Sequence, residues 1–160
     1  HKESLHLEEF DLSELTEMVA EEAQGLAESK AVTLTAEIEP GILVKADQTL
    51  MMRIWLNLLT NAVKYGRQQG QIWLTLKSDG KNAVGTVRDD GIGISAAELP
   101  KIWKRFYRVN TARSSGDDSG TGLGLAMVKW MVESHGGTVS AVSTLGAGST
   151  FSFTIPLRPL

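Results

Sequence analysis

The chain has 160 residues, of which 42% are hydrophobic and 22% are charged, a composition that is ordinary for a globular domain. It contains no cysteine, which excludes disulfides and thiolate metal sites, and its formal net charge of -3 offers no basic surface for nucleic acid. Its apolar runs are too short to span a bilayer and no signal peptide opens it, so we expect one cytoplasmic domain.

The first predicted helix follows a short polar segment. Residues 1–10 are expected to end an upstream linker or helix, and the domain itself is expected over residues 11–160. Asp11 starts the helix, because Glu14 completes a capping-box pattern and apolar residues then recur on one face. A strand is predicted over residues 32–38, where polar and apolar residues alternate.

A second helix and a hairpin come next. Asp47 is the predicted N-cap of the helix, which is expected to end near Tyr65. Strands are predicted over residues 71–78 and 82–88, because an Asp-Gly pair between them is a strong hairpin signal.

The C-terminal half alternates glycine-rich turns with regular elements. A turn at residues 89–94 precedes a short helix predicted over residues 96–106, and the polar residues 108–119 are expected to form a mobile loop. The remaining predicted elements are a helix over residues 120–135 and strands over residues 138–144 and 150–157. This order predicts an α/β two-layer sandwich, with helices on one face of a mixed β-sheet.

Four polar residues share one face of the second predicted helix. Asn57, Asn61, Lys64 and Tyr65 lie at positions i, i+4, i+7 and i+8. Asparagine is a modest helix former, so two asparagines at this spacing beside a lysine need an explanation. A solvated surface stripe is the ordinary explanation and a ligand-binding face is the alternative; neighbouring motifs decide between them.

A carboxylate and two close glycines directly follow a predicted strand, in the sequence Asp-Asp-Gly-Ile-Gly-Ile of residues 89–94. Asp89 can accept hydrogen bonds, while Gly91 and Gly93 let the backbone approach a ligand closely. Ile94 ends the motif. Plain turns also contain Asp-x-Gly, so this motif alone leaves both interpretations open.

A second glycine cluster opens the long C-terminal helix. Glycines at a helix N-terminus suit phosphate, because unpaired N–H groups and the positive end of the helix dipole face the ligand. The spacing fits neither a Walker loop nor a Rossmann loop, and a plain connector is the alternative. The cluster comprises Gly120, Thr121, Gly122, Leu123, Gly124 and Leu125.

Two further segments complete the pattern: Lys-Arg-Phe-Tyr-Arg at residues 104–108 and Gly-Ala-Gly-Ser-Thr-Phe at residues 146–151. In this order and spacing, the five segments resemble the motifs of the GHKL ATPase superfamily and, within it, the catalytic and ATP-binding domain of sensor histidine kinases. The resemblance covers about residues 8–158 and implies a Bergerat-type sandwich with a mobile ATP lid.

The resemblance implies that Mg·ATP binds between the second helix and the glycine motifs. Asp89 would accept a hydrogen bond from the 6-amino group of adenine, which guanine does not offer. Asn57 would hold Mg²⁺ through its amide oxygen, and Asn61 would contact the phosphates. Lys64 would place a point charge against phosphate, and Tyr65 would flank the nucleotide.

The resemblance also assigns roles outside the second helix. Arg108 matches the family arginine that reaches the γ-phosphate, so catalysis is assigned to Asn57, Lys64 and Arg108. Thr150 matches a position near the adenine. The other implied nucleotide contacts are Gly91, Gly93, Ile94, Gly120, Thr121, Gly122, Leu123, Gly124 and Leu125.

Several positions depart from the family pattern. Asp90 stands where asparagine is usual, Trp103 replaces phenylalanine, and Gly66 stands where a hydroxyl residue is common. Arg53 occupies the place of the glutamate that activates water in hydrolytic relatives. Because arginine stays protonated and cannot act as that base, transfer to a partner is favoured over hydrolysis.

The partners that the resemblance implies lie outside this chain. They are an upstream helical domain with a phosphoacceptor histidine, in the same or a partner subunit, and a response regulator receiver domain. His1, His6 and His135 lie in no recognisable acceptor motif, so the chain alone is expected to bind Mg·ATP without autophosphorylation. The parent is expected to be a membrane sensor. A nucleotide-switched binding protein and an inactive pseudokinase are the alternatives.

Overall fold

The computed structural model describes residues 4–105, 107 and 124–158. Its elements, in chain order, are β1 (Glu8–Asp11), α1 (Leu12–Ser29), β2 (Thr33–Ile38), β3 (Leu43–Ala46), α2 (Gln48–Tyr65), β4 (Gln71–Ser78), β5 (Asn82–Asp89), the 3-10 turn η1 (Leu99–Lys101), α3 (Gly124–Ser134), β6 (Val139–Thr144) and β7 (Gly148–Pro156).

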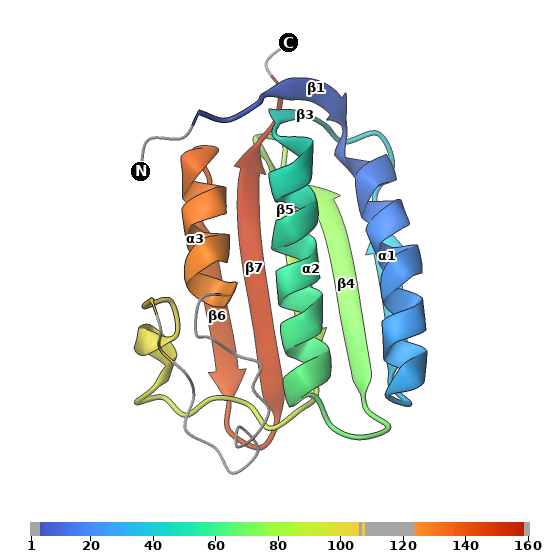
Figure 1. The fold of residues 1–160 in the computed structure, drawn as a ribbon, viewed down its shortest axis with the longest axis vertical. Coiled ribbons are helices and arrows are strands. Elements are labelled where there is room, and N and C mark those ends of the chain that lie inside the picture. Colours follow the sequence, from blue (N-terminus) through green and yellow to red (C-terminus); the bar gives the residue numbers. More distant parts are fainter. Residues whose placement is uncertain (1–3, 106, 108–123, 159–160) are drawn as a thin grey trace.

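The main sheet has five strands in the order β2-β4-β5-β7-β6. The β2–β4 pair is parallel, and the other neighbours are antiparallel. Helices α1, α2 and α3 lie side by side over one face of this sheet, with α2 in the middle (Figure 1). The predicted two-layer sandwich with a mixed sheet is confirmed.

The core lies between α2 and the sheet. Trp55 of α2 is fully buried and meets Phe153 of β7 edge to face, with ring centroids 4.9 Å apart. The indole N–H donates to the Thr16 hydroxyl of α1 at 3.0 Å, so this buried polar group is satisfied. These contacts fix α2 against both the sheet and α1.

Two predicted elements differ from the structure. Residues 1–10 were expected to end an upstream linker or helix, and residues 8–10 instead belong to β1, which pairs antiparallel with β3. The helix predicted over residues 96–106 is reduced, in its described part, to the 3-10 turn η1 and further turns. Pro100 explains this difference, because it lacks an N–H and disfavours helical backbone in the residue before it.

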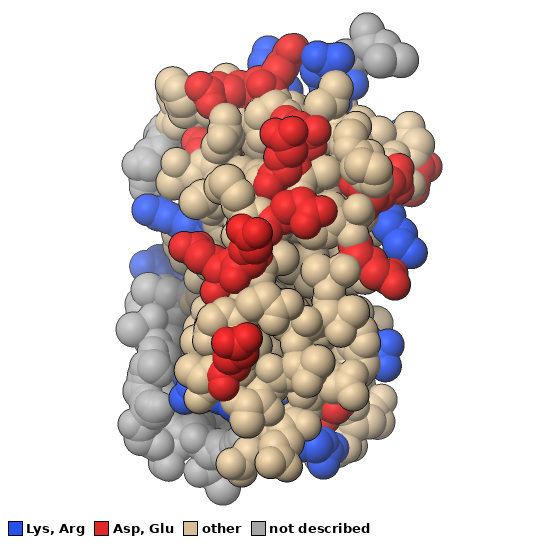
Figure 2. Space-filling model, turned by 90° about the vertical axis from the view of Figure 1, so that its right-hand side faces the viewer, with Lys and Arg blue, Asp and Glu red and all other residues tan. Residues whose placement is uncertain are grey.

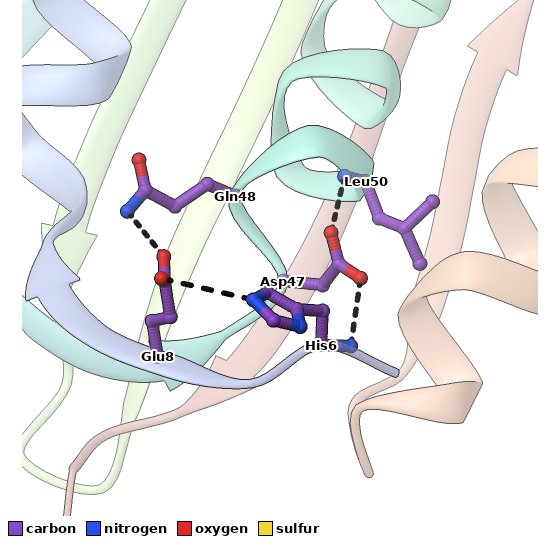
Figure 3. Close-up of polar contacts among 5 residues, drawn as sticks. All are labelled: His6, Glu8, Asp47, Gln48 and Leu50. Carbon is purple, nitrogen blue, oxygen red and sulfur yellow. Dashed lines mark hydrogen bonds and ion pairs between the residues drawn. The ribbon is translucent and has the colours of Figure 1, made fainter. Parts of the chain in front are cut away.

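The start of α2 is tied to the N-terminal segment through Asp47. Its Oδ1 accepts the Leu50 N–H at 3.1 Å, and its Oδ2 accepts the His6 N–H at 3.0 Å (Figure 3). The Asp47 N–H donates to Nε2 of His135, just beyond α3, at 3.0 Å. Burial acts to raise the pKa of Asp47, but hydrogen bonds from the N–H groups of His6, Leu50 and Thr49 act in the opposite direction, and the pKa is lowered overall.

Asp47→Ala is therefore expected to cost about 1–2 kcal/mol of unfolding free energy at neutral pH, because two backbone donors lose their acceptor. Since folding lowers the pKa of Asp47, this contribution is lost as the pH falls through that lowered value. Urea unfolding would measure both effects. Asp11→Ala is the control, because Asp11 caps only Glu14 of α1, and an equal loss in the two variants would contradict the junction role of Asp47.

The outer face of α1 is acidic, as Figure 2 shows from that side. Its exposed carboxylates are Glu14, Glu17, Glu21, Glu22 and Glu28. A phosphate-bearing ligand would be repelled there. No helix in the described part of the chain has the length and apolar character needed to cross a membrane.

Candidate nucleotide site

The polar face predicted for α2 exists, and it is not an open surface. Asn57, Asn61, Lys64 and Tyr65 are all half-buried, whereas Arg53 is exposed. The Lys64 Nζ lies 5.3 Å from the centroid of the Tyr65 ring, so the cation and the aromatic ring sit together at the end of the helix. The apolar side of α2 packs into the core through Met51, Ile54, Trp55, Leu58, Leu59 and Ala62.

Asp89 is a buried carboxylate at the end of β5, with only 6% of its surface exposed. It belongs to the helix-covered face of the sheet, because Val87 two residues earlier is a core residue. Burial raises the pKa of Asp89 to about 6, although the N–H groups of Gly91 and Ser149 oppose the rise. The Gly91 N–H donates to Oδ1 at 2.8 Å. An ionised carboxylate here costs folding energy, which a donating ligand would recover.

The turn after Asp89 lies between the end of α2 and the β6–β7 turn. The Ile92 N–H donates to the Tyr65 carbonyl at 3.2 Å, and the Ile92 carbonyl accepts the Gly146 N–H at 2.7 Å. The Ile94 N–H donates to the Ser143 hydroxyl at 2.7 Å. The turn is thereby joined to both neighbouring segments, and it brings Asp89 close to the end of the α2 polar face.

The glycines of this turn are needed by the protein's own backbone. A Cβ on Gly91 would collide with the Tyr65 carbonyl, and a Cβ on Gly93 would collide with the Thr144 carbonyl. Gly93 also has a φ of +73°, which other residues rarely adopt. We expected these glycines to admit a ligand, and the structure gives them a second role, which is to let three backbone segments meet; the ligand role stays a prediction.

The position predicted for Thr150 needs correction. Thr150 pairs with Arg88 across β5 and β7, and Arg88 projects from the uncovered face of the sheet, where its guanidinium lies over Trp73 at 4.2 Å. The structure thus places Thr150 on the opposite face from Asp89. Ser149, which pairs with Asp89, is buried, and its hydroxyl lies 2.8 Å from that of Ser143. Ser149 is the hydroxyl residue on the Asp89 side.

Asp90, which departs from the family pattern, directs its carboxylate toward the start of β4. Its Oδ1 accepts the Gln71 N–H at 3.0 Å. Its charge nevertheless helps to raise the pKa of Asp89. Asp90 therefore holds a loop and tunes its neighbour.

The remaining predicted contacts lie at or beyond the edge of the described structure. Gly124 and Leu125 begin α3, which packs beside α2. Trp103 meets Phe151 edge to face at 6.0 Å, so the segment around Trp103 is anchored on β7. Among the described residues, no group of three or more His, Asp or Glu side chains could hold a metal ion. Outside the described residues are Arg108, Gly120, Thr121, Gly122 and Leu123.

These features together define an ATPase-type α/β sandwich. Helices cover one face of a mixed sheet, and the helix that carries the asparagines ends next to the turn that holds Asp89 and the two glycines. Residues 46–159 match the family described as "Histidine kinase-, DNA gyrase B-, and HSP90-like ATPase". The chain belongs to this family, and within it to the catalytic ATP-binding domains of sensor histidine kinases.

Relatives and solved structures agree with this assignment. Sensor histidine kinase TmoS of Ectopseudomonas mendocina is 38% identical over 149 residues, which are 92% of this chain and 15% of that protein. Sensor histidine kinase YclK of Bacillus subtilis is 35% identical, over 91% of this chain and 31% of that protein. The chain thus spans less than a third of the length of these relatives.

Two solved structures contain a domain with the same fold over nearly the whole of this chain. The mycobacterial sensor histidine kinase MprB superposes with a TM-score of 0.83 at 28% identity, covering 96% of this chain and 100% of that one. Full-length ShkA in complex with AMPPNP also gives a TM-score of 0.83, at 30% identity, covering 100% of this chain and 33% of that one.

Proposed function

We propose that this domain binds Mg·ATP between α2 and the 89–94 turn, and that its parent protein passes the γ-phosphate to a histidine on an upstream helical domain. A response regulator receiver domain would accept the phosphate next. The observation that carries the proposal is the buried Asp89 carboxylate, which precedes a turn hydrogen-bonded to the end of α2, the helix that carries the half-buried Asn57 and Asn61 amides. The ATP analogue in the ShkA structure supports an adenine nucleotide as the ligand.

The adenine would be selected by Asp89. Its carboxylate accepts hydrogen bonds and cannot donate when ionised, so it suits the 6-amino group of adenine and rejects the carbonyl oxygen of guanine. Ser149 lies on the same face and offers a hydroxyl beside the base. Because the pKa of Asp89 is about 6, the accepting form dominates at neutral pH.

The phosphate end would be held by the amides and the cation of α2. Asn57 is the residue proposed to hold Mg²⁺, since a neutral amide oxygen suits an ion that takes its charged ligands from the triphosphate. Asn61 would contact the phosphates, and Lys64 would add a positive charge. When bound, Mg²⁺ would neutralise charge on the transferring phosphoryl group. Arg108 and the Gly120–Gly124 segment remain proposed contacts from the lid side.

The residue one helical turn before Asn57 favours transfer of the γ-phosphate to a partner over hydrolysis of ATP. Arg53 is exposed and, as an arginine, cannot act as a general base for water. We further propose that the parent is a membrane sensor whose catalytic domain faces the cytoplasm, as a two-component pathway requires.

Asn57→Ala is expected to weaken binding of Mg·ATP by about 10- to 100-fold, because a ligand of the ion is lost, while binding of ATP in excess EDTA changes little. Calorimetric titration measures both affinities. Thr60→Ala is the matched control, since Thr60 also lies on α2 but is exposed and is not among the proposed contacts. Wild-type affinity in Asn57→Ala would contradict the site.

The same two variants test the reaction in the full-length parent. Incubation with radiolabelled ATP should give an acid-labile, base-stable phosphoprotein in the wild type and in Thr60→Ala, and none in Asn57→Ala. A wild-type parent that binds Mg·ATP without forming phosphohistidine would favour a nucleotide-switched binding protein instead.

A further inference from the structure

Arg67 links two loops that meet beneath the proposed adenine site. It lies in the loop that follows α2, at the lower end of the sandwich in Figure 1. Its Nε donates to the Asp90 carbonyl at 2.8 Å, and its terminal NH₂ donates to the Gly146 carbonyl at 3.1 Å. One guanidinium therefore joins the Asp89–Ile94 turn to the β6–β7 turn.

Each of these turns carries part of the proposed site. Asp90 separates Asp89 from Gly91, whose N–H holds the Asp89 carboxylate. Gly146 is the middle residue of the turn, residues 145–147, that leads into β7 and Ser149. The β5–β7 pairing fixes Ser149 beside Asp89, and the position of the 89–94 turn sets how the Gly91 N–H orients the Asp89 carboxylate.

Away from the close contact of Gly93 with Thr144 and Leu145, the two turns are separated by open space. A hollow of about 430 Å³ opens between them, lined by Gly66, Arg67, Gln68, Gly91, Ile92, Leu145 and Gly146. Where packing is sparse, directional hydrogen bonds have a larger share in fixing the geometry. The backbone bond from Gly146 to Ile92 is one such link, and the two bonds of Arg67 are others.

The loop that carries Arg67 is itself well fixed. The Arg67 carbonyl accepts the Gly70 N–H at 2.8 Å, and the Asp90 carboxylate accepts the N–H of the next residue, Gln71. Arg67 thus bonds to the backbone of Asp90, while the side chain of Asp90 bonds back to the loop of Arg67. These two hydrogen bonds in opposite directions fix the position of the Arg67 guanidinium.

We propose that Arg67 is a positioning residue for adenine recognition, acting by holding the two turns in register rather than by touching the phosphates. The inference rests on the proposed function. An arginine suits the task because its planar fork offers donors at a fixed separation to two acceptors, whereas a lysine provides one point charge.

The test compares Arg67→Met, Arg67→Lys and the control Arg88→Met, whose guanidinium lies over Trp73 on the uncovered face. Both Arg67 variants are expected to bind Mg·ATP and Mg·ADP about 3- to 10-fold more weakly, by the same factor for both nucleotides. In both Arg67 variants the preference for Mg·ATP over Mg·GTP should also fall. Arg88→Met should bind these nucleotides with wild-type affinity.

In the nucleotide-free domain, both Arg67 variants should shift the amide resonances of Gly91 and Gly146, a readout that does not require nucleotide binding. Unchanged resonances, or wild-type affinity in Arg67→Met, would overturn the proposal. So would wild-type affinity in Arg67→Lys, or a greater loss for ATP than for ADP, since either result indicates attraction of phosphate by charge. Failure of the wild type to bind any nucleotide, with the resonance shifts present, would reject the proposed function and leave the link between the turns established.

Discussion

Asp89→Asn is expected to make the nucleotide-free domain more stable while weakening Mg·ATP binding about 10- to 100-fold, the range for a lost charged hydrogen bond. Burial raises the pKa of Asp89 from 3.8 to about 6, so ionising it in the folded state has a cost. At neutral pH that cost is on the order of 3 kcal/mol. An asparagine removes the charge but keeps one acceptor, and we expect it to recover about 1–2 kcal/mol.

The raised pKa of Asp89 also determines how the free energy of unfolding changes with pH. The folded state holds the Asp89 proton more tightly than the unfolded state, so the free energy of unfolding falls as the pH rises from about 4 to about 6 and is then constant. Urea unfolding should therefore find Asp89→Asn about 1 kcal/mol less stable than the wild type near pH 4 and more stable than it above pH 6, with the two curves crossing between these values.

Asp79→Asn is the control of opposite sign. The N–H groups of Asn82 and Lys81 lower the pKa of Asp79, so removing its charge should destabilise the domain at neutral pH. An Asp89→Asn variant that is less stable than the wild type at pH 7.5, or whose difference from it does not vary with pH, would contradict the account of Asp89.

Gly93→Ala is expected to cost about 3 kcal/mol or more of unfolding free energy and to abolish measurable Mg·ATP binding. Its φ of +73° is strained for alanine, and the new Cβ would also collide with the Thr144 carbonyl. Because the collision pushes the 89–94 turn away from the β6–β7 turn, the site is lost together with the stability.

Gly146→Ala separates the effect of backbone strain from the effect of the Cβ collision. Gly146 has a similar φ of +85°, but a Cβ there would have no neighbour within 4 Å. It should cost only about 1 kcal/mol, the strain of the backbone alone. Equal losses of unfolding free energy in the two variants would show that the packing of the three segments at Gly93 is not tight.

The elements that were predicted well are those with local signals. The start of α2 was predicted from its N-cap Asp47, and its end at Tyr65 from the limit of its apolar periodicity. β1 could not be predicted in this way, because it is a strand only through pairing with β3, more than 30 residues away in the chain. The helix predicted over residues 96–106 gave too little weight to Pro100.

The site shows the same division. The polar face of α2 and the Asp89 carboxylate were predicted from spacing and motif, and the structure joins the turn after Asp89 to the end of α2. Thr150 was chosen where Ser149 shares the face of Asp89, since a shift of one residue in a strand exchanges the two faces. The alternation of Phe151 and Phe153 was the available signal. The sequence contained no signal for the role of Arg67, because its hydrogen-bond partners are backbone carbonyls.

The most direct test of the central claim is a titration of the ¹⁵N-labelled domain with Mg·ATP, followed by NMR. The account predicts that the side-chain amides of Asn57 and Asn61 and the backbone amide of Gly91 shift together and saturate with one dissociation constant. The side-chain amide of Gln24, which donates to Leu34 at the α1 side, should not move. Saturating nucleotide that leaves Asn57, Asn61 and Gly91 unshifted would contradict the proposed site.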